Sequence, residues 1–237
     1  MAETFYVGAY WGPRAEPVDA CAERLAGFLT DLAQISPLLG SWFKTASSRK
    51  AALKRPIEPT TEQLRALLQA GQARRDDDAR SVMSELGFAA DLWNGQDILV
   101  GLRVRCGAPA AIQGMTSNTL VMQLPAAEGD AVTLYQRQVA LAVIRAVVTA
   151  WQPSWSTWTS HRLRKVQEPQ PGEVVAGWAT YVADPKGVLA ERLPAGATIE
   201  PHGTGLLLVA EGDADSVSES TVSAMRTALG RALRPAS

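Results

Sequence analysis

Histidine, cysteine and an excess of charge of either sign are all scarce in this chain. Two histidines and two cysteines occur in 237 residues, and the formal net charge is −1. Proteins that coat nucleic acid are usually basic and mimics of DNA are acidic, so the charge balance argues against both classes. Cys21 and Cys106 form neither a disulfide framework nor a metal-binding spacing, and we predict that both are small buried apolar residues. We expect no metal and no cofactor.

Long apolar segments are absent as well. No run approaches the roughly 18 apolar residues of a membrane-spanning helix. The start of the chain, MAETFYVGAY, lacks the basic residues and the apolar stretch of a signal peptide. We therefore expect a cytoplasmic protein that contacts no membrane. Because no linker divides the chain convincingly, we predict a single domain over residues 1–237.

A strong hairpin signal lies between Leu86 and Gly107, where the turn dipeptide Asn94-Gly95 separates two runs of alternating apolar residues. Side chains of a strand alternate between two faces, so the register decides whether the apolar faces of the two runs meet. A two-residue turn mixes the faces, whereas a bulged loop over residues 94–96 brings the apolar faces together. The predicted pairs are Leu92–Ile98, Ala90–Val100, Phe88–Leu102 and Leu86–Val104.

Other elements follow from the spacing of apolar residues. Alternation predicts strands over residues 4–11 and 118–124, further strands are predicted over 158–166 and 174–183, and a continuously apolar run predicts another over 206–210. Recurrence every three or four residues predicts helices over 17–35 and 60–71, one from after residue 130 to 151, and a last one capped by Asp213 or Asp215. Strands and helices do not alternate strictly in this order. The sequence therefore predicts an α+β fold with a mainly antiparallel sheet packed with about four helices.

The sequence offers little for catalysis. Neither histidine lies in an HExxH, HxE or HxH motif, and no glycine-rich phosphate loop occurs. Ser160 and His161 are neighbours in a predicted strand, so their side chains should point to opposite faces and cannot form a nucleophile–base pair. His202 is predicted to be a turn residue. The residues favour a binding protein, with a small hydrolase or transferase using His161 as one alternative and a scaffold or adaptor as another.

Tryptophan is abundant, with seven residues. Trp155 and Trp158 lie in a polar segment interrupted by proline, and we expect both side chains to be partly exposed. Exposed Trp and Arg are the residue types that dominate the binding energy of protein–protein interfaces. Trp11, Trp93 and Trp178 fall in predicted strands, where we expect core residues.

Five short motifs, in this order, resemble the immunity protein 52 family of bacterial polymorphic toxin systems. They are YVGAYWGPR (6–14), LGFAADLWNG (86–95), RVRCG (103–107), WQPSW (151–155) and GWATY (177–181). They span nearly the whole chain, although residues 38–59 and the last helix contain no matching motif. Members of this family are α+β proteins that protect a cell from a cognate toxin, commonly a nuclease with a restriction-endonuclease-like domain. In some systems, type VI secretion delivers the toxin.

The resemblance implies that this chain binds a cognate nuclease toxin in the cytoplasm and neutralises it by steric occlusion, without catalysis and without binding nucleic acid itself. A nuclease has a basic substrate groove, which an inhibitor can cover with acidic side chains or with an apolar anchor inside a polar rim. The expected partner-binding residues are the anchors Trp155 and Trp158 and the acidic residues Asp76, Asp77, Asp78, Asp213 and Asp215, with Glu211 beside the last two.

Overall fold

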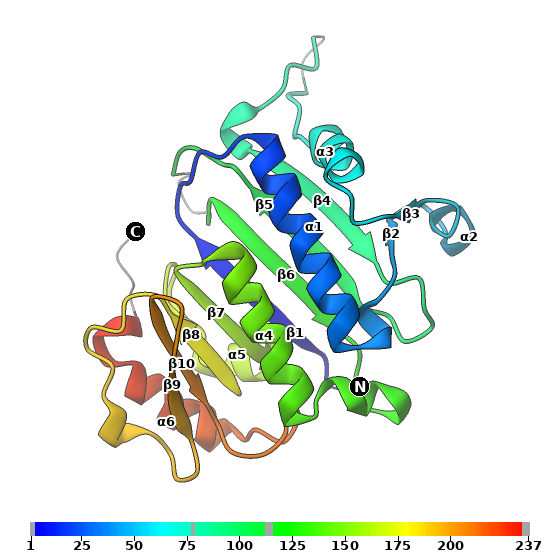
Figure 1. The fold of residues 1–237 in the computed structure, drawn as a ribbon. Helices are drawn as coiled ribbons and strands as arrows, with labels where there is room; N and C mark the ends of the chain where they lie inside the picture. Colours follow the sequence, from blue (N-terminus) through cyan, green and yellow to red (C-terminus); the bar gives the residue numbers. More distant parts are fainter. Residues whose placement is uncertain (1–2, 77–78, 112–115, 234–237) are drawn as a thin grey trace. The chain divides into compact units, whose positions relative to one another are not determined.

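The computed structural model describes residues 3–76, 79–111 and 116–233 (Figure 1). The chain divides into two compact units: unit 1 combines residues 1–10 and 123–237, and unit 2 comprises residues 11–122. Four helices have 18, 10, 15 and 11 residues, and ten strands with antiparallel pairs occur in the described residues. The predicted α+β class is confirmed, and the single domain over 1–237 stays a prediction. None of the helices described is long and apolar enough to cross a membrane.

Unit 2 contains strands in the order β3-β2-β4-β5-β6. Their bounds are β2 (Trp42–Lys44), β3 (Pro56–Ile57), β4 (Phe88–Trp93), β5 (Gly101–Cys106) and β6 (Asn118–Leu124). The helices are α1 (Val18–Ile35), α2 (Arg49–Ala52) and α3 (Thr61–Ala70), with 3-10 turns at Pro37–Leu39 and Ser84–Leu86. α1 packs against α3, and α3 packs against β4 (Figure 1).

Both long helices of unit 2 begin and end where the sequence predicts. Pro17 precedes the first turn of α1, where a missing backbone N–H leaves no hydrogen bond unmade. The apolar stripe of α1 is buried and includes Cys21, Leu25, Phe28 and Leu32. At the start of α3, the Thr60 side chain accepts a hydrogen bond from the backbone N–H of Gln63. The two helices therefore bring an apolar surface to one side of the strands.

The β4–β5 hairpin has the predicted faces but a different register. Its pairs include Phe88–Cys106, Ala90–Val104 and Leu92–Leu102. Leu92 thus faces Leu102 instead of the predicted Ile98, because the connection runs over residues 94–100 instead of 94–96. A shift by an even number of residues leaves each side chain on its own face. The predicted pairs were wrong, and the predicted sides of the sheet were right.

Asn94 explains the longer loop. Its buried side-chain amide donates to the carbonyl oxygens of Leu38 and Ile98 at 3.1 and 2.8 Å. Its side-chain oxygen accepts from the backbone N–H of Val100 at 3.0 Å. Gly95 follows with a φ of +75°, a conformation that favours glycine. One partner, Leu38, is distant in sequence, so the local turn signal could not reveal this loop.

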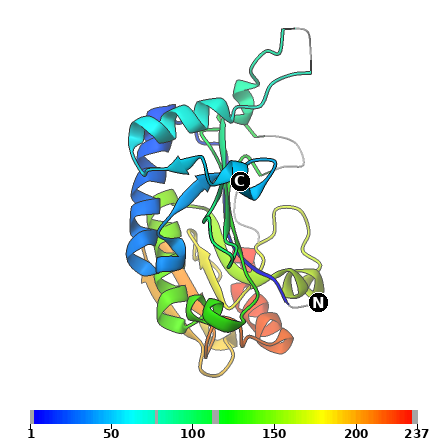
Figure 2. The same ribbon diagram turned by 90° about the vertical axis from the view of Figure 1, so that its right-hand side faces the viewer.

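Unit 1 contains strands in the order β1-β7-β8-β10-β9. Their bounds are β1 (Phe5–Trp11), β7 (Trp155–Ser160), β8 (Ala179–Val182), β9 (Thr198–His202) and β10 (Gly205–Val209). The helices are α4 (Arg137–Trp151), α5 (His161–Gln167) and α6 (Glu219–Leu229), with 3-10 segments at Gly129–Leu134, Ala190–Arg192 and Gly230–Leu233. α4 lies on one side of these strands, and α5 and α6 lie on the other (Figures 1 and 2).

The core of unit 1 is a cluster of aromatic rings. Trp158 meets Tyr135 and Trp178 edge to face, with ring centroids 5.9 and 6.1 Å apart. Phe5 meets Tyr135 in the same way at 5.0 Å. Edge-to-face contacts place the positive edge of one ring against the negative face of another, which adds to the stabilisation from burial.

The predicted strand over residues 158–166 is wrong in its second half. β7 ends at Ser160, and the Ser160 side chain accepts a hydrogen bond from the backbone N–H of Leu163, which starts α5. The polar and basic residues that suggested an exposed strand instead form the outer surface of a short helix. The predicted strand over 174–183 is also shorter, because regular pairing is confined to β8.

The end of the chain differs from the prediction in two ways. β9 was not predicted, because its sequence TIEPH is short and contains Pro201, which is tolerated here in a strand at the edge of the sheet. Neither Asp213 nor Asp215 caps α6. The cap is Ser218, whose side chain accepts from the backbone N–H of Thr221.

Candidate partner-binding surface

The strands of unit 2 have one covered face and one open face. Burial alternates along β5, where Leu102, Val104 and Cys106 are buried and Gly101, Arg103 and Arg105 are not. α1 and α3 lie on one side of β4 and β5 (Figure 2). Trp93 is opposite both Gly101 and Phe43 in the pairing, so its ring shares a face with Phe43. We define the open face by Phe43, Asp91, Trp93, Gly101, Arg103 and Arg105.

A hollow of about 440 Å³ lies at this face, between β4, the loop 94–100 and α2. Its walls include Arg49, Ala52, Trp93, Asp97, Leu99 and Gly101, and we call it the Trp93 groove. Gly101 has no side chain to lie across the neighbouring Trp93 ring. Leu99 is 56% exposed, a large fraction for an apolar side chain at a concave site. The volume falls within the range of pockets that hold a ligand or a partner's side chain.

An exposed ion pair forms the charged wall of the groove. The Arg49 guanidinium lies 5.8 Å from the centroid of the Trp93 ring and pairs with the Asp97 carboxylate. The side chains of Arg49 and Asp97 are 56% and 85% exposed. Solvent screens such pairs, which typically contribute about 0–1 kcal/mol. A charged group from a partner can therefore replace either member at small cost.

The segment that contains α2 and supplies Arg49 to the groove is rich in positive charge. The stretch 42–55 contains five basic residues and no acidic one; they are Lys44, Arg49, Lys50, Lys54 and Arg55. Lys50, Lys54 and Arg55 are exposed. The near-neutral net charge of the chain thus conceals a strongly basic patch in this part of unit 2.

Trp155 and Trp158, the predicted anchors, differ in accessibility. Trp158 is fully buried, so the prediction that it is partly exposed was wrong. The two residues are three positions apart on β7 and point to opposite faces, and the Trp158 face carries the aromatic core. Trp155 is half-buried and stacks on Tyr10, with ring centroids 4.1 Å apart. Of the two tryptophans, Trp155 is the one whose side chain is accessible to a partner.

The predicted acidic contacts are divided between the two units. Asp76 is exposed in unit 2, and Asp213 and Asp215 are exposed in unit 1. Asp77 and Asp78 lie outside the described residues. Asp213 also has a structural role, because its carboxylate accepts a hydrogen bond at 2.8 Å from the backbone N–H of Arg137, the first residue of α4. A partner-binding role for these acids stays a prediction.

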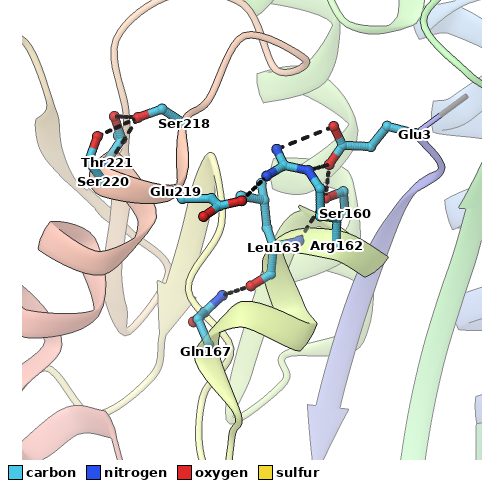
Figure 3. A network of polar contacts seen from close by, with 9 residues as sticks. All are labelled: Glu3, Ser160, Arg162, Leu163, Gln167, Ser218, Glu219, Ser220 and Thr221. Atoms are coloured by element: carbon cyan, nitrogen blue, oxygen red, sulfur yellow. Dashed lines mark hydrogen bonds and ion pairs between the residues drawn. The ribbon is translucent and has the colours of Figure 1, made fainter.

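His161 is the first residue of α5, and its two neighbours in the chain, Ser160 and Arg162, take part in a network of polar contacts (Figure 3). Arg162 forms ion pairs with both Glu3 and Glu219, and Ser160 hydrogen-bonds to Glu3. The hydrogen bond to Glu3 raises the pKa of Arg162 above its already high usual value. The network joins the start of the chain to α5 and α6, which is a structural role within unit 1.

The surroundings of His161 do not form a recognisable catalytic set. Its ring centroid lies 5.1 Å from that of Tyr6, and its Nε2 is 3.3 Å from the side-chain oxygen of Gln123. A hydrolytic mechanism needs a nucleophile and an orienting acid around such a base. His202, predicted in a turn, is instead the last residue of β9, and its Nε2 lies 3.3 Å from the carbonyl oxygen of Arg145. In the part of the chain described, no group of His, Cys, Asp and Glu could hold a metal ion.

The cysteines are buried, as predicted, and neither forms a disulfide. A hydrogen bond with Cys21 and burial both raise the pKa of the Cys106 thiol. A thiol that keeps its proton is a poor nucleophile. The pair therefore belongs to the packing between α1 and β5.

Sequence reasoning missed the Trp93 groove, although two signals for it were present. The first is the run of basic residues without acids in 42–55, which had no assigned structure. The second is Leu99, which breaks the alternation that the hairpin otherwise follows. The position of Trp93 on the open face also differs from its expected core role, since its side chain is only half-buried.

Comparison with known proteins identifies the family. One solved structure, described as Pseudomonas aeruginosa T6SS protein PA0821, is similar over 98% of this chain and 77% of that chain, with a TM-score of 0.54 and 13% sequence identity. At this identity the likeness shows a shared fold. The curated proteins gave no match. The family model for Immunity protein 52 matches residues 3–236, and the chain therefore belongs to the immunity protein 52 family.

Proposed function

We propose that this protein is an immunity protein that binds a cognate nuclease toxin with a restriction-endonuclease-like domain in the cytoplasm and neutralises it by steric occlusion. Membership of the immunity protein 52 family is the observation that carries the proposal. The shared fold with a T6SS protein supports a link to type VI secretion.

The surface of unit 2 supports a binding mechanism. The open face combines aromatic rings with arginines, the residue types that supply most of the binding energy in protein interfaces. The Trp93 groove gives this face a concave centre, and the exposed charges around it provide a polar rim. Trp155 in unit 1, together with the acidic residues Asp76, Asp77, Asp78, Asp213 and Asp215, remains a candidate for further contacts.

The alternative, a small hydrolase or transferase that uses His161, lacks an observation in its favour. The neighbours of His161, Tyr6 and Gln123, do not supply an acid, and Ser160 is engaged in capping α5 and in bonding Glu3. Inhibition by binding needs no such set of groups.

Co-expression with a candidate toxin encoded by a neighbouring gene tests the proposal. We expect the two proteins to copurify and the complex to lack the nuclease activity of the released toxin. The matched control is His161→Ala, which should protect as well as the wild type. Failure of the wild-type chain to bind or to inhibit the toxin would reject the proposal, and loss of protection in His161→Ala without loss of binding would favour an enzymatic role.

A further inference from the structure

We propose that the Trp93 groove receives an apolar side chain of the toxin next to an acidic one, and that Arg49 binds the toxin's carboxylate in place of Asp97. The inference rests on the proposed function, because it describes the segment of the toxin that the groove recognises. It concerns a basic and aromatic site in unit 2, whereas the sequence had suggested the anchors Trp155 and Trp158 together with acidic residues.

The shape of the groove selects the apolar part of this segment. Trp93 forms its floor, and the exposed side chain of Leu99 forms a wall. Gly101 leaves the space beside the ring free of a side chain from β5. A cavity of about 440 Å³ is large enough for one aromatic or long aliphatic side chain with part of its backbone. Burying Trp93 and Leu99 beneath such a side chain would remove apolar surface from water, which favours association.

The charge of Arg49 and of the segment around it selects the acidic part. Five basic residues lie in the stretch 42–55 without an acid, and Lys50, Lys54 and Arg55 are exposed. Charge complementarity across an interface increases the rate of association and disfavours wrong partners. A neutral or basic segment would gain nothing from these positive charges. The structure thus favours a toxin segment with carboxylates.

Asp97 occupies the position that the toxin's carboxylate would take. It pairs with Arg49 at the mouth of the groove, and with 85% of its side chain exposed it is almost fully hydrated. When the toxin's carboxylate takes over the contact with Arg49, the guanidinium stays paired and beside Trp93, and the displaced Asp97 carboxylate turns to solvent. The two members of this ion pair therefore have opposite effects on binding: Arg49 attracts the toxin, and Asp97 competes with it.

The opposite effects expected of Arg49 and Asp97 can be tested by measuring toxin affinity. The intact toxin domain, released from the co-expressed complex by denaturant and refolded, is titrated with variants of this chain. We expect Arg49→Glu and Trp93→Ala each to weaken binding by about tenfold or more, as for central contacts of an interface. Asp97→Asn should strengthen binding by about twofold or more, mainly because association becomes faster. Added salt should reduce this gain in the association rate.

A second ion pair provides the matched control. Arg65 on α3 pairs with Asp19 on α1, and both side chains are exposed, at 45% and 55%. Arg65→Glu and Asp19→Asn repeat the charge changes on the helical side of unit 2. We expect both to leave the affinity within about twofold of the wild type. Circular dichroism and thermal unfolding are used to check that each variant is folded.

Each outcome bears on one claim. A toxin complex that forms normally with Arg49→Glu and Trp93→Ala would overturn the groove assignment and leave the proposed function intact. Weaker binding by Asp97→Asn would overturn the exchange of carboxylates. If the wild-type chain forms dimers that Trp93→Ala dissociates, the groove holds a second copy of this chain and the inference fails. If the wild-type chain binds no toxin, the proposed function fails together with the inference.

Discussion

The strands of the two units carry different patterns of burial. All four residues of β8 are buried, and β1 has a single residue that is not. In β5 and β6, buried residues instead alternate with more exposed ones. Unit 1 has helices on both sides of its strands, whereas α1 and α3 of unit 2 lie on one side (Figures 1 and 2). The strands of unit 1 are therefore covered on both faces, as in a scaffold, whereas the strands of unit 2 keep one face available for recognition.

The strands of the two units also differ in the polar side chains that they carry. In strands covered on both faces, burial of a polar group costs least where the group is hydrogen-bonded, as with Ser156, whose hydroxyl donates to the carbonyl oxygen of Gly8 at 2.9 Å. Strands with an open face can carry charges, as with Arg103, which bonds the Asp91 carboxylate directly across from it. Tryptophan therefore has different roles in the two units: Trp158 is part of the core of unit 1, and Trp93 lines a groove of unit 2.

Replacing one tryptophan in each unit tests this contrast and should give the largest effect. Trp158→Ala removes a fully buried ring from the aromatic core and should lower the free energy of unfolding by about 3–5 kcal/mol. Trp93→Ala should cost less than about 2 kcal/mol, because its ring is only half-buried. Urea denaturation measures both values. Equal losses would remove the distinction between core and surface.

Asn94→Ala should have the next largest effect, and it acts on unit 2. The change removes the side-chain hydrogen bonds with Leu38, Ile98 and Val100 and leaves the buried backbone N–H of Val100 without this acceptor. We expect a loss of about 2–3 kcal/mol in the free energy of unfolding and weaker toxin binding, because the same loop forms the groove. Gln96→Ala in the same loop is the control, with an expected change within about 0.5 kcal/mol. If Asn94→Ala left the free energy of unfolding unchanged, Asn94 would not be what holds the 94–100 loop and sets the hairpin register.

A smaller effect is expected from the contact that starts α4 in unit 1. Asp213→Ala leaves the backbone N–H of Arg137 without its acceptor and removes a negative charge from the N-terminus of the helix. The expected loss is about 1 kcal/mol, as for other capping side chains. Asp215→Ala provides a nearby acidic control in chemical denaturation. If the toxin affinity falls while stability does not, the acid acts as a partner contact as the sequence suggested.

The smallest effect concerns alkaline pH. Burial raises the pKa of Tyr6 above its ordinary value of about 10, so the folded protein keeps the phenolic proton where the unfolded chain loses it. This contribution is fully present below about pH 10 and is lost as the pH rises further. Tyr6→Phe should therefore make the free energy of unfolding fall less steeply above about pH 10, with little change at pH 7. Identical alkaline slopes for the two proteins would show that folding does not raise the pKa of Tyr6.

Local patterns in the sequence were sufficient for much of the fold. The stripes of α1 and α3, the alternation of β1 and β6 and the absence of strict βα order gave the α+β class and the sides that face the core. Periodicity reports which side of an element is apolar, and that property survives even when the register differs, as in β4 and β5. The motifs also indicated the immunity protein 52 family, which the family match over residues 3–236 confirms.

Contacts between residues distant in sequence decided the rest. The bond from Asn94 to Leu38 extends the hairpin loop, and the register of β7 buries Trp158 while Trp155 stacks on Tyr10. The Trp93 groove combines α2, β4 and the loop 94–100, none of which contains the site alone. A sequence determines which residues are apolar or charged and how they alternate. Only tertiary packing decides which of them remain at the surface together, because exposure depends on what the rest of the chain covers.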